Sequence, residues 1–188
     1  VTLIAVNIYG SDTIVKKDLI TISSDGPVAA ACTTVTTNNY GGIGIYNVTL
    51  DSINNTTGDG KDGYRDYTCT HYATVVAGVP YTLTVITGSI YKEYVRVWID
   101  FNNDGSFNDS TELVFKSDNI LLTHTGTIIL PGTVVYDTIL RMRAASDYPN
   151  APSSCNNINA GQAEDYGITI LHNINPPVAD FKTTDTLS

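Results

Sequence analysis

The strongest chemical signal in the chain is an oxygen-rich stretch, DFNNDGSF, at residues 100–107. Side chains with oxygen atoms stand at alternate positions, and a glycine follows the third of them. A hard cation such as Ca²⁺ takes about 6–8 oxygen ligands, and alternation directs Asp100, Asn102 and Asp104 toward one centre. Gly105 permits the sharp turn that brings a backbone carbonyl inward. The pattern therefore predicts a calcium-binding loop.

Residues farther along the chain complete the candidate donor set. Ser106 occupies the next alternate position, Asp109 is a substitute ligand, and Glu112 could close the shell with both carboxylate oxygens. In an EF-hand the closing glutamate would stand at position 111, which is Thr111 here. Strand-like sequences flank the loop, YVRVWID before it and ELVF after it, so we expect a calcium loop between strands. The alternative is an Asn/Asp–Gly turn whose side chains cap its own backbone without a metal.

A second group of acidic residues stands where strands are expected to begin. Its members are Asp62, Asp66, Glu164 and Asp165. The favoured interpretation is strand-end capping together with ion pairs to Arg65, Arg141 or Arg143. A second calcium site or a carboxylate–arginine bridge is the alternative.

The remaining reactive residue types give little support for catalysis. The histidines His71, His124 and His172 are isolated, and neither HExxH nor GxSxG occurs. We therefore expect a protein that is not an enzyme.

The cysteines Cys32, Cys69 and Cys155 are widely spaced and form no CxxC or Cys/His cluster, which argues against zinc. In an oxidising compartment we expect one disulfide and one free thiol. Three pairings are open, and a bond that involves Cys155 is favoured.

The elements that would position these residues are strands. The 188 residues include 26 Thr, 19 Ile and 16 Val against 11 Leu and 1 Met, and branching at Cβ favours pleated strands over helices. Charged residues make up 15%, too few for exposed helices with many ion pairs. The net charge of −9, without a basic cluster, argues against nucleic acid as a partner. No apolar run approaches the roughly 20 residues that span a bilayer, so membrane insertion is not expected.

The order of the apolar segments predicts three parts. Residues 1–24 form a hairpin around a turn at 7–12. Residues 28–172 form one all-β antiparallel sandwich or jelly roll, because seven short stretches alternate between apolar and polar residues. These stretches are 43–50, 65–75, 81–87, 94–100, 125–130, 138–144 and 166–171. Residues 176–188 contain one short strand, Val178–Lys182. The chain begins inside a strand pattern, so we expect a piece of a longer polypeptide.

Four motifs in the central part carry a resemblance to a known family: VWIDFNNDGSFNDSTELV at 97–114, GYRDYT at 63–68, TILRMRA at 138–144 and GQAEDYGITI at 161–170. Their order and spacing resemble the GEVED domain, a β-sandwich module of large secreted and surface proteins of Bacteroidetes. Two positions depart from the family pattern: Gln162 stands where an acidic residue is usual, and Cys69 directly follows the DYT motif.

The ends of the chain resemble pieces of a second family. The first 22 residues are similar to the last two strands of a PKD-type immunoglobulin-like repeat, and PPVADF resembles the opening strand of the next repeat. The two resemblances imply a secreted, cell-surface structural or adhesive repeat, rigidified by Ca²⁺. We expect its terminal strands to pair with other copies or neighbouring repeats, building a filament or ring, and cell-surface glycans are a further expected partner. The alternative is a glycan- or protein-binding accessory module of a secreted enzyme such as a protease.

Overall fold

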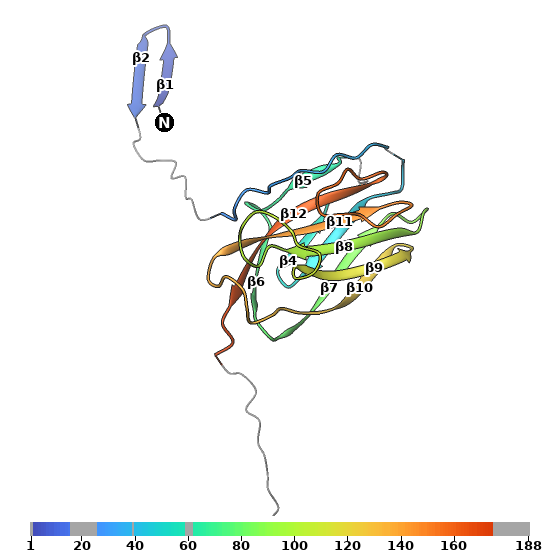
Figure 1. Ribbon diagram of the computed structural model, residues 1–188. Helices are drawn as coiled ribbons and strands as arrows, with labels where there is room; N and C mark the ends of the chain where they lie inside the picture. The colour runs from blue at the N-terminus through green and yellow to red at the C-terminus, as the bar shows by residue number, and fades with distance from the viewer. Residues whose placement is uncertain (1, 16–25, 39, 59–61, 175–188) are drawn as a thin grey trace, which may run out of the picture.

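The computed structural model describes residues 2–15, 26–38, 40–58 and 62–174. The described residues form twelve strands and no helix, so the expectation of an all-β chain is confirmed (Figure 1). None of them belongs to a helix long and apolar enough to cross a membrane. The expected strand Val178–Lys182 lies outside the described residues.

The first two strands form the expected hairpin. Strand β1 (Thr2–Asn7) pairs antiparallel with β2 (Gly10–Val15). Every residue of both strands is exposed, including Leu3, Ile4 and Val6, each more than half exposed. An isolated two-stranded hairpin is at best marginally stable in water. The hairpin therefore presents apolar side chains that neither of its strands covers.

The central part of the chain forms a sandwich of two sheets, as the alternating pattern predicts (Figure 1). The four-stranded sheet has the order β10 (Thr123–Ile129), β7 (Pro80–Thr87), β3 (Ile45–Leu50) and β4 (Ile53–Thr56). The six-stranded sheet has the order β5 (Tyr64–Asp66), β12 (Gly161–Leu171), β11 (Ile139–Asp147), β8 (Glu93–Ile99) and β9 (Leu113–Ile120), with β6 (Tyr72–Val76) also paired to β12.

The prediction of one strand over residues 65–75 is wrong. The structure places two short strands there, β5 and β6, and both run parallel to β12 along the same edge. The break has a local cause. Asp66 Oδ1 accepts hydrogen bonds from both the backbone N–H and the hydroxyl of Thr68, and the carbonyl of Tyr67 accepts the N–H groups of Thr70 and His71. These bonds fold residues 66–71 into a turn.

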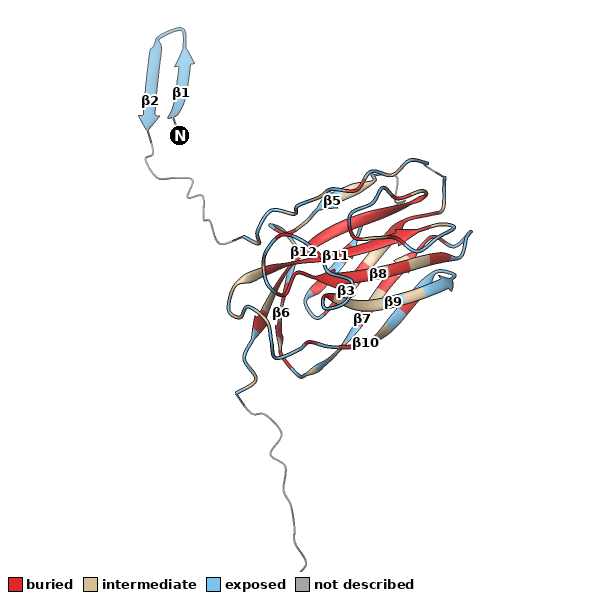
Figure 2. Ribbon diagram, viewed as in Figure 1, coloured by how far each residue is buried: buried red, intermediate tan, exposed pale blue. Residues whose placement is uncertain are grey.

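The main core lies between the sheets, and a second, smaller core lies on the outer face of the six-stranded sheet. This second cluster, here called the outer core, consists of Trp98, Phe107, Ala145, Ile158 and Ala163. Strand β12 is buried at nearly every position, instead of at every second one, because both of its faces are covered (Figure 2). Of the candidate site residues, Asp165 lies on this covered face with Arg143, and residues 100–112 connect β8 to β9.

Candidate functional site

The predicted calcium loop joins β8 to β9. Asp100 follows the last residue of β8 and is fully buried. Its Oδ1 accepts the N–H of Asp104 at 3.1 Å, and its Oδ2 accepts the N–H of Gly105 at 2.8 Å. Gly105 has φ +84°, a left-handed conformation that glycine adopts without strain. The carboxylate at the start of the loop thus turns inward and fixes the tight turn at Gly105.

The alternate oxygen side chains after Asp100 hydrogen-bond within the same turn. Asn102 Oδ1 accepts the N–H of Asp104 at 3.1 Å, and Asn102 Nδ2 donates to Asp104 Oδ2 at 2.8 Å. Asp104 Oδ1 accepts the N–H of Ser106 at 2.7 Å. These hydrogen bonds bring Asp100, Asn102 and Asp104 into one turn, with Ser106 attached through its backbone.

Glu112 closes the loop from the other end. It is 3% exposed, and its two carboxylate oxygens accept the N–H groups of Phe101 at 3.0 Å and of Asn108 at 2.8 Å. Burial raises the pKa of Glu112, and the charge of Asp100 adds to this shift. Burial likewise raises the pKa of Asp100, with a further contribution from the charge of Asp104. Three carboxylates therefore concentrate negative charge at one loop.

Asp109 has a different partner. Its Oδ1 accepts the indole N–H of Trp98 at 2.7 Å, and this bond holds Trp98 in the outer core. Asp109 thus bonds to Trp98, whereas the carboxylate of Glu112 bonds back to two backbone N–H groups of the loop.

The donor set of the loop is compatible with a hard cation. All of the side-chain atoms that could bind a metal ion here are oxygens. A carboxylate oxygen that accepts one hydrogen bond keeps a second lone pair for a metal ion. The same hydrogen bonds also hold the turn in shape, as the metal-free alternative requires. Among the residues that the structure describes, no group of three or more His, Cys, Asp and Glu side chains is arranged as a metal site.

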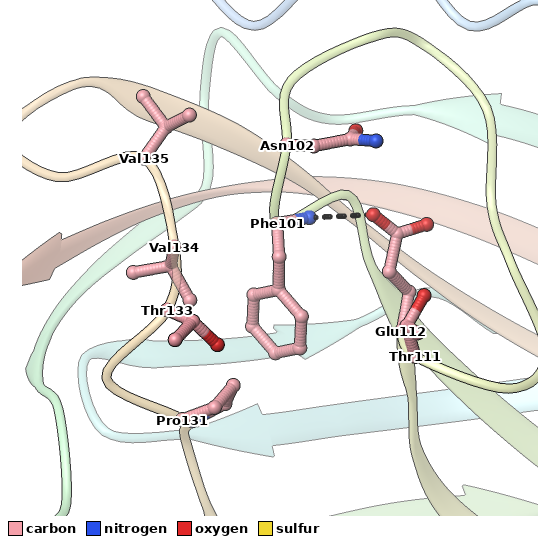
Figure 3. A pocket seen from close by; sticks show the side chains of 8 residues that line it. All are labelled: Phe101, Asn102, Thr111, Glu112, Pro131, Thr133, Val134 and Val135. Atoms are coloured by element: carbon pink, nitrogen blue, oxygen red, sulfur yellow. Dashed lines mark hydrogen bonds between the residues drawn. The ribbon is translucent and has the colours of Figure 1, made fainter.

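An open groove of about 600 Å³ lies beside the loop. Figure 3 shows the ring of Phe101 on one side of it, with Pro131 and Val134 facing the ring, and the N–H of Phe101 bonded to Glu112. The groove is mainly apolar and is continuous with the loop through Glu112.

The second acidic group does not come together at one centre. Asp66 and Asp165 share Arg141, whose Nη1 lies 2.9 Å from a carboxylate oxygen of each. Asp62 pairs with Arg65 at 2.8 Å on the surface. Each of the three arginines named from the sequence thus has an acidic partner, Arg143 with Asp165 included.

Glu164 is the member of this group that makes no ion pair in the described structure. It points to the opposite face of β12, into the main core, where Tyr166 donates its hydroxyl hydrogen bond to Oε2 at 2.5 Å. Its Oε1 has no hydrogen-bond partner in the described structure, and burial raises the pKa of Glu164 to about 7.

Arg143 is a fully buried charged residue on the outer face of the six-stranded sheet. Its Nε and Nη2 donate to the two carboxylate oxygens of Asp165 at 2.7 and 2.8 Å, and both side chains are 0% exposed. Its Nη1 donates to the carbonyl of Ser154 and its Nη2 to the carbonyl of Cys32. The guanidinium also lies 4.8 Å from the centre of the Phe107 ring. One side chain therefore joins β11, β12 and three covering segments.

The cysteines add a covalent bond at the same place. Cys32 and Cys155 form a disulfide, with their Cα atoms 5.5 Å apart, and Cys69 is free and exposed. The partner of Cys155 is thus Cys32, from the segment that precedes the first strand of the sandwich.

Part of this site lies on a stretch that matches a known family. Residues 94–169 match the family model of the GEVED domain. The matched GEVED region spans the Asp100 loop, Arg143 and Asp165, but not the segment that carries Cys32. It supports the interpretation of this part of the chain as an extracellular type of module. A comparison with curated proteins found no match to the chain.

The sequence did not predict two features of the structure: the segment that covers the outer face, and a buried glutamate. The segment 28–38 covers the outer core without alternating apolar residues, so its pattern gave no signal. Glu93 is fully buried at the start of β8, where its carboxylate accepts the N–H groups of Gly44 and Gly88. Its position two residues before the buried alternation of Val95 and Val97 was the available signal.

Proposed function

We propose that this chain is a non-catalytic structural and adhesive repeat of a large secreted cell-surface protein, and that Ca²⁺ rigidifies it at the Asp100 loop. The observation that carries the proposal is this loop. It begins and ends with a buried carboxylate, Asp100 and Glu112, and both of these side chains turn into it. The match to the GEVED domain supports an extracellular module in which millimolar calcium would fill weak sites.

The residues that would hold the ion are those with oxygen atoms in the loop. These are Asp100, Asn102, Asp104, Ser106 and Glu112, with Asp109, which also accepts the indole N–H of Trp98, as a substitute ligand. A bound divalent cation would offset the mutual repulsion of the three carboxylates, which contributes to the raised pKa values of Asp100 and Glu112. The ion has no chemical step to perform here. It stabilises the folded loop by mass action, by about 2.7 kcal/mol at a free concentration one hundred times Kd.

The exposed hairpin supports a role in assembly. Leu3 pairs with Ile14 on one face, while Ile4 and Val6 lie on the other, so both faces carry exposed apolar side chains. We propose that the hairpin gains a partner by strand addition from a second copy or a neighbouring repeat, through its segment 176–188. Exchange of this kind would remove free strand edges and build a filament or ring.

The environments of two of the three histidines support a non-catalytic role. His124 is buried between the hydroxyls of Thr87 and Ser117, and burial lowers its pKa to about 4. His172 stacks on Tyr136 with ring centroids 3.6 Å apart. Both side chains are engaged in packing.

Calorimetry and melting test the calcium proposal. Titration of the chelator-treated chain with Ca²⁺ should give a binding isotherm, and saturating Ca²⁺ should raise the melting temperature. The variant Asp100→Asn should lose both effects. The variant Asp118→Asn removes a carboxylate that is 57% exposed and should keep them. Absence of binding heat together with an unchanged melting curve would refute calcium rigidification.

Light scattering tests assembly separately. The full chain should form particles larger than a monomer, and deletion of residues 174–188 or of residues 1–24 should reduce them to monomers. If the deletions leave the assembly state unchanged, the strand-exchange proposal is wrong.

One observation favours the alternative of a glycan-binding accessory module. Tyr91 and Tyr148 lie with ring centroids 5.2 Å apart, and Tyr91 is 39% exposed. Exposed aromatic rings stack on sugar rings. Dose-dependent binding to a polysaccharide that is lost in Tyr91→Ala would support the module, and no binding across a polysaccharide screen would support the spacer.

A further inference from the structure

Residues 28–38, here called the strap, precede the first strand of the sandwich, β3, and lie across the outer face of the six-stranded sheet. The strap contains no regular strand, and its one bridge is between Thr36 and Ile158. In Figure 1 it is the blue segment along the upper edge of the sandwich. Arg141 Nε on β11 donates to the carbonyl of Val28 at 3.3 Å. Three further attachments follow along the strap, and only the first of them involves the Asp100 loop.

The first attachment is to the Asp100 loop. The N–H of Val28 donates to Asn103 Oδ1 at 3.2 Å, and the N–H of Ala31 donates to the carbonyl of Gly105 at 2.7 Å. The contact between them is close: a Cβ added to Gly105 would lie 2.5 Å from the carbonyl oxygen of Ala29. The loop and the first residues of the strap therefore fit together with no spare room.

The second and third attachments do not involve that loop. Cys32 is bonded to Cys155, and its carbonyl accepts a hydrogen bond from Arg143. Beyond it, the N–H groups of Thr37 and Asn38 donate to the carbonyls of Ile158 and Asn159 at 2.9 and 2.8 Å. The part of the strap from Cys32 onward is thus held by a covalent bond and by the segment 155–161.

The first attachment depends on the conformation of the loop. Both acceptors belong to residues with left-handed backbone, Asn103 at φ 55° and Gly105 at φ 84°. The turn around them is held by Asp100, whose carboxylate accepts the N–H groups of Asp104 and Gly105. If the carboxylate released these N–H groups, Asn103 Oδ1 and the carbonyl of Gly105 would leave the positions that Val28 and Ala31 require.

We propose that the Asp100 loop is a clasp for residues 28–31, and that the Cys32–Cys155 disulfide stops its release from spreading along the strap. The clasp fixes the point where the chain joins the sandwich after the N-terminal hairpin. An ion in the loop would tighten the clasp, and this part of the inference rests on the proposed calcium site. Calcium would then stiffen a junction between modules, while the core stays as it is.

Amide hydrogen exchange measured by mass spectrometry tests the clasp without a metal. The variant Gly105→Ala forces a methyl group against Ala29, and Asn103→Gly removes the acceptor for Val28 while keeping the left-handed backbone accessible. In both variants the amides of residues 28–31 should exchange about tenfold faster, the effect of losing one hydrogen bond. Those of Thr37 and Asn38 should be unchanged.

A matched glycine variant is the control. Gly132 has no atom nearer than 3.6 Å to an added Cβ, and Gly132→Ala should leave the strap unchanged. Equal acceleration across residues 28–38 in the test variants, or none at residues 28–31, would overturn the clasp. Asn103→Gly keeps the test valid if Gly105→Ala does not fold.

Exchange in Ca²⁺ and in chelator tests the tightening. Calcium should slow exchange at residues 28–31 and leave Thr37 unaffected. If calorimetry shows binding but exchange at residues 28–31 does not change, the tightening is wrong and the calcium site stands. If calorimetry shows no binding, the proposed calcium site is wrong. The exchange rates of Gly105→Ala and Asn103→Gly then still test the clasp.

Discussion

Arg143 and Asp165 form a two-pronged ion pair between neighbouring strands, with both side chains completely buried on the outer face of the six-stranded sheet. Two parallel N–H···O bonds of this kind fix direction as well as distance. Because Arg143 also donates to the carbonyls of Cys32 and Ser154, the pair positions the strap and the segment around Cys155 together. The ion pair therefore anchors both of these segments to the outer face of the sheet.

Removal of one charge from this pair should be strongly destabilising. Asp165→Asn leaves the buried guanidinium of Arg143 without its counter-ion, and we expect a loss of about 3–5 kcal/mol in the free energy of unfolding. Asp62→Asn is the control, because the Asp62–Arg65 pair is exposed to solvent and should contribute little to stability. Urea unfolding of both variants gives the comparison. Similar small losses in the two would contradict the central role of the buried pair.

The disulfide should contribute to the free energy of unfolding mainly by restricting the conformations of the unfolded chain. Cys32 and Cys155 are separated by 123 residues, and a closed loop of this size places the expected loss for Cys32→Ser/Cys155→Ser near the upper end of about 2–5 kcal/mol. Cys69→Ser changes an exposed free cysteine and should be nearly neutral. Guanidinium unfolding without reductant measures both. A loss in Cys69→Ser as large as in the double variant would argue against this assignment.

Gly161 should tolerate no side chain. A Cβ added there would lie against the backbone carbonyl of Ser146, on the neighbouring strand β11, and 2.9 Å from the Cα of Asp147. Backbone atoms of a central strand cannot move aside at low energy, so Gly161→Ala should cost about 1–3 kcal/mol or more. Gly132→Ala, where space is open, should cost well under 1 kcal/mol in the same thermal melts. Equal melting temperatures for the two variants would contradict the close strand approach.

The alternating strands could be predicted from sequence, because one face of each packs into the main core. The segment predicted at 94–100 is β8, Glu93–Ile99, with Val95 and Val97 pointing inward. The outer core could not be predicted in the same way. Trp98 points to the face opposite Val95 and Val97, as strand alternation requires. Arg143 and Asp165 carry charges and such residues are normally exposed; here the strap and loops from distant parts of the chain bury them.

The candidate loop was predictable to the extent that its contacts are local. Alternation alone brings Asp100, Asn102 and Asp104 into one turn, since their hydrogen bonds span few residues. The role of Asp109 was not predictable, because it depends on the indole of Trp98, which another part of the sheet positions. The break between β5 and β6 has a local cause at Asp66, but apolar alternation on either side concealed it.

Glu93 gives the sandwich a titratable group inside its core. Both carboxylate oxygens accept backbone N–H groups, from Gly44 at 3.0 Å and from Gly88 at 3.1 Å. Burial nevertheless dominates and raises the pKa of Glu93 from an ordinary value of 4.5 to about 7. The folded chain therefore keeps this proton at pH values where the unfolded chain has lost it.

The sign of the pH effect follows from that difference. Between about pH 4.5 and 7 the folded state binds more protons at Glu93 than the unfolded state, so the stability from this group falls as pH rises, in total by on the order of 3 kcal/mol. Glu93→Gln does not titrate and should gain stability relative to the native chain when melts at pH 8 are compared with melts at pH 5. Asp51→Asn, which changes a carboxyl at an exposed turn, is the matched control for loss of an acidic side chain. If the stability difference between Glu93→Gln and the native chain is the same at both pH values, Glu93 does not exchange its proton on unfolding, and the raised pKa is wrong.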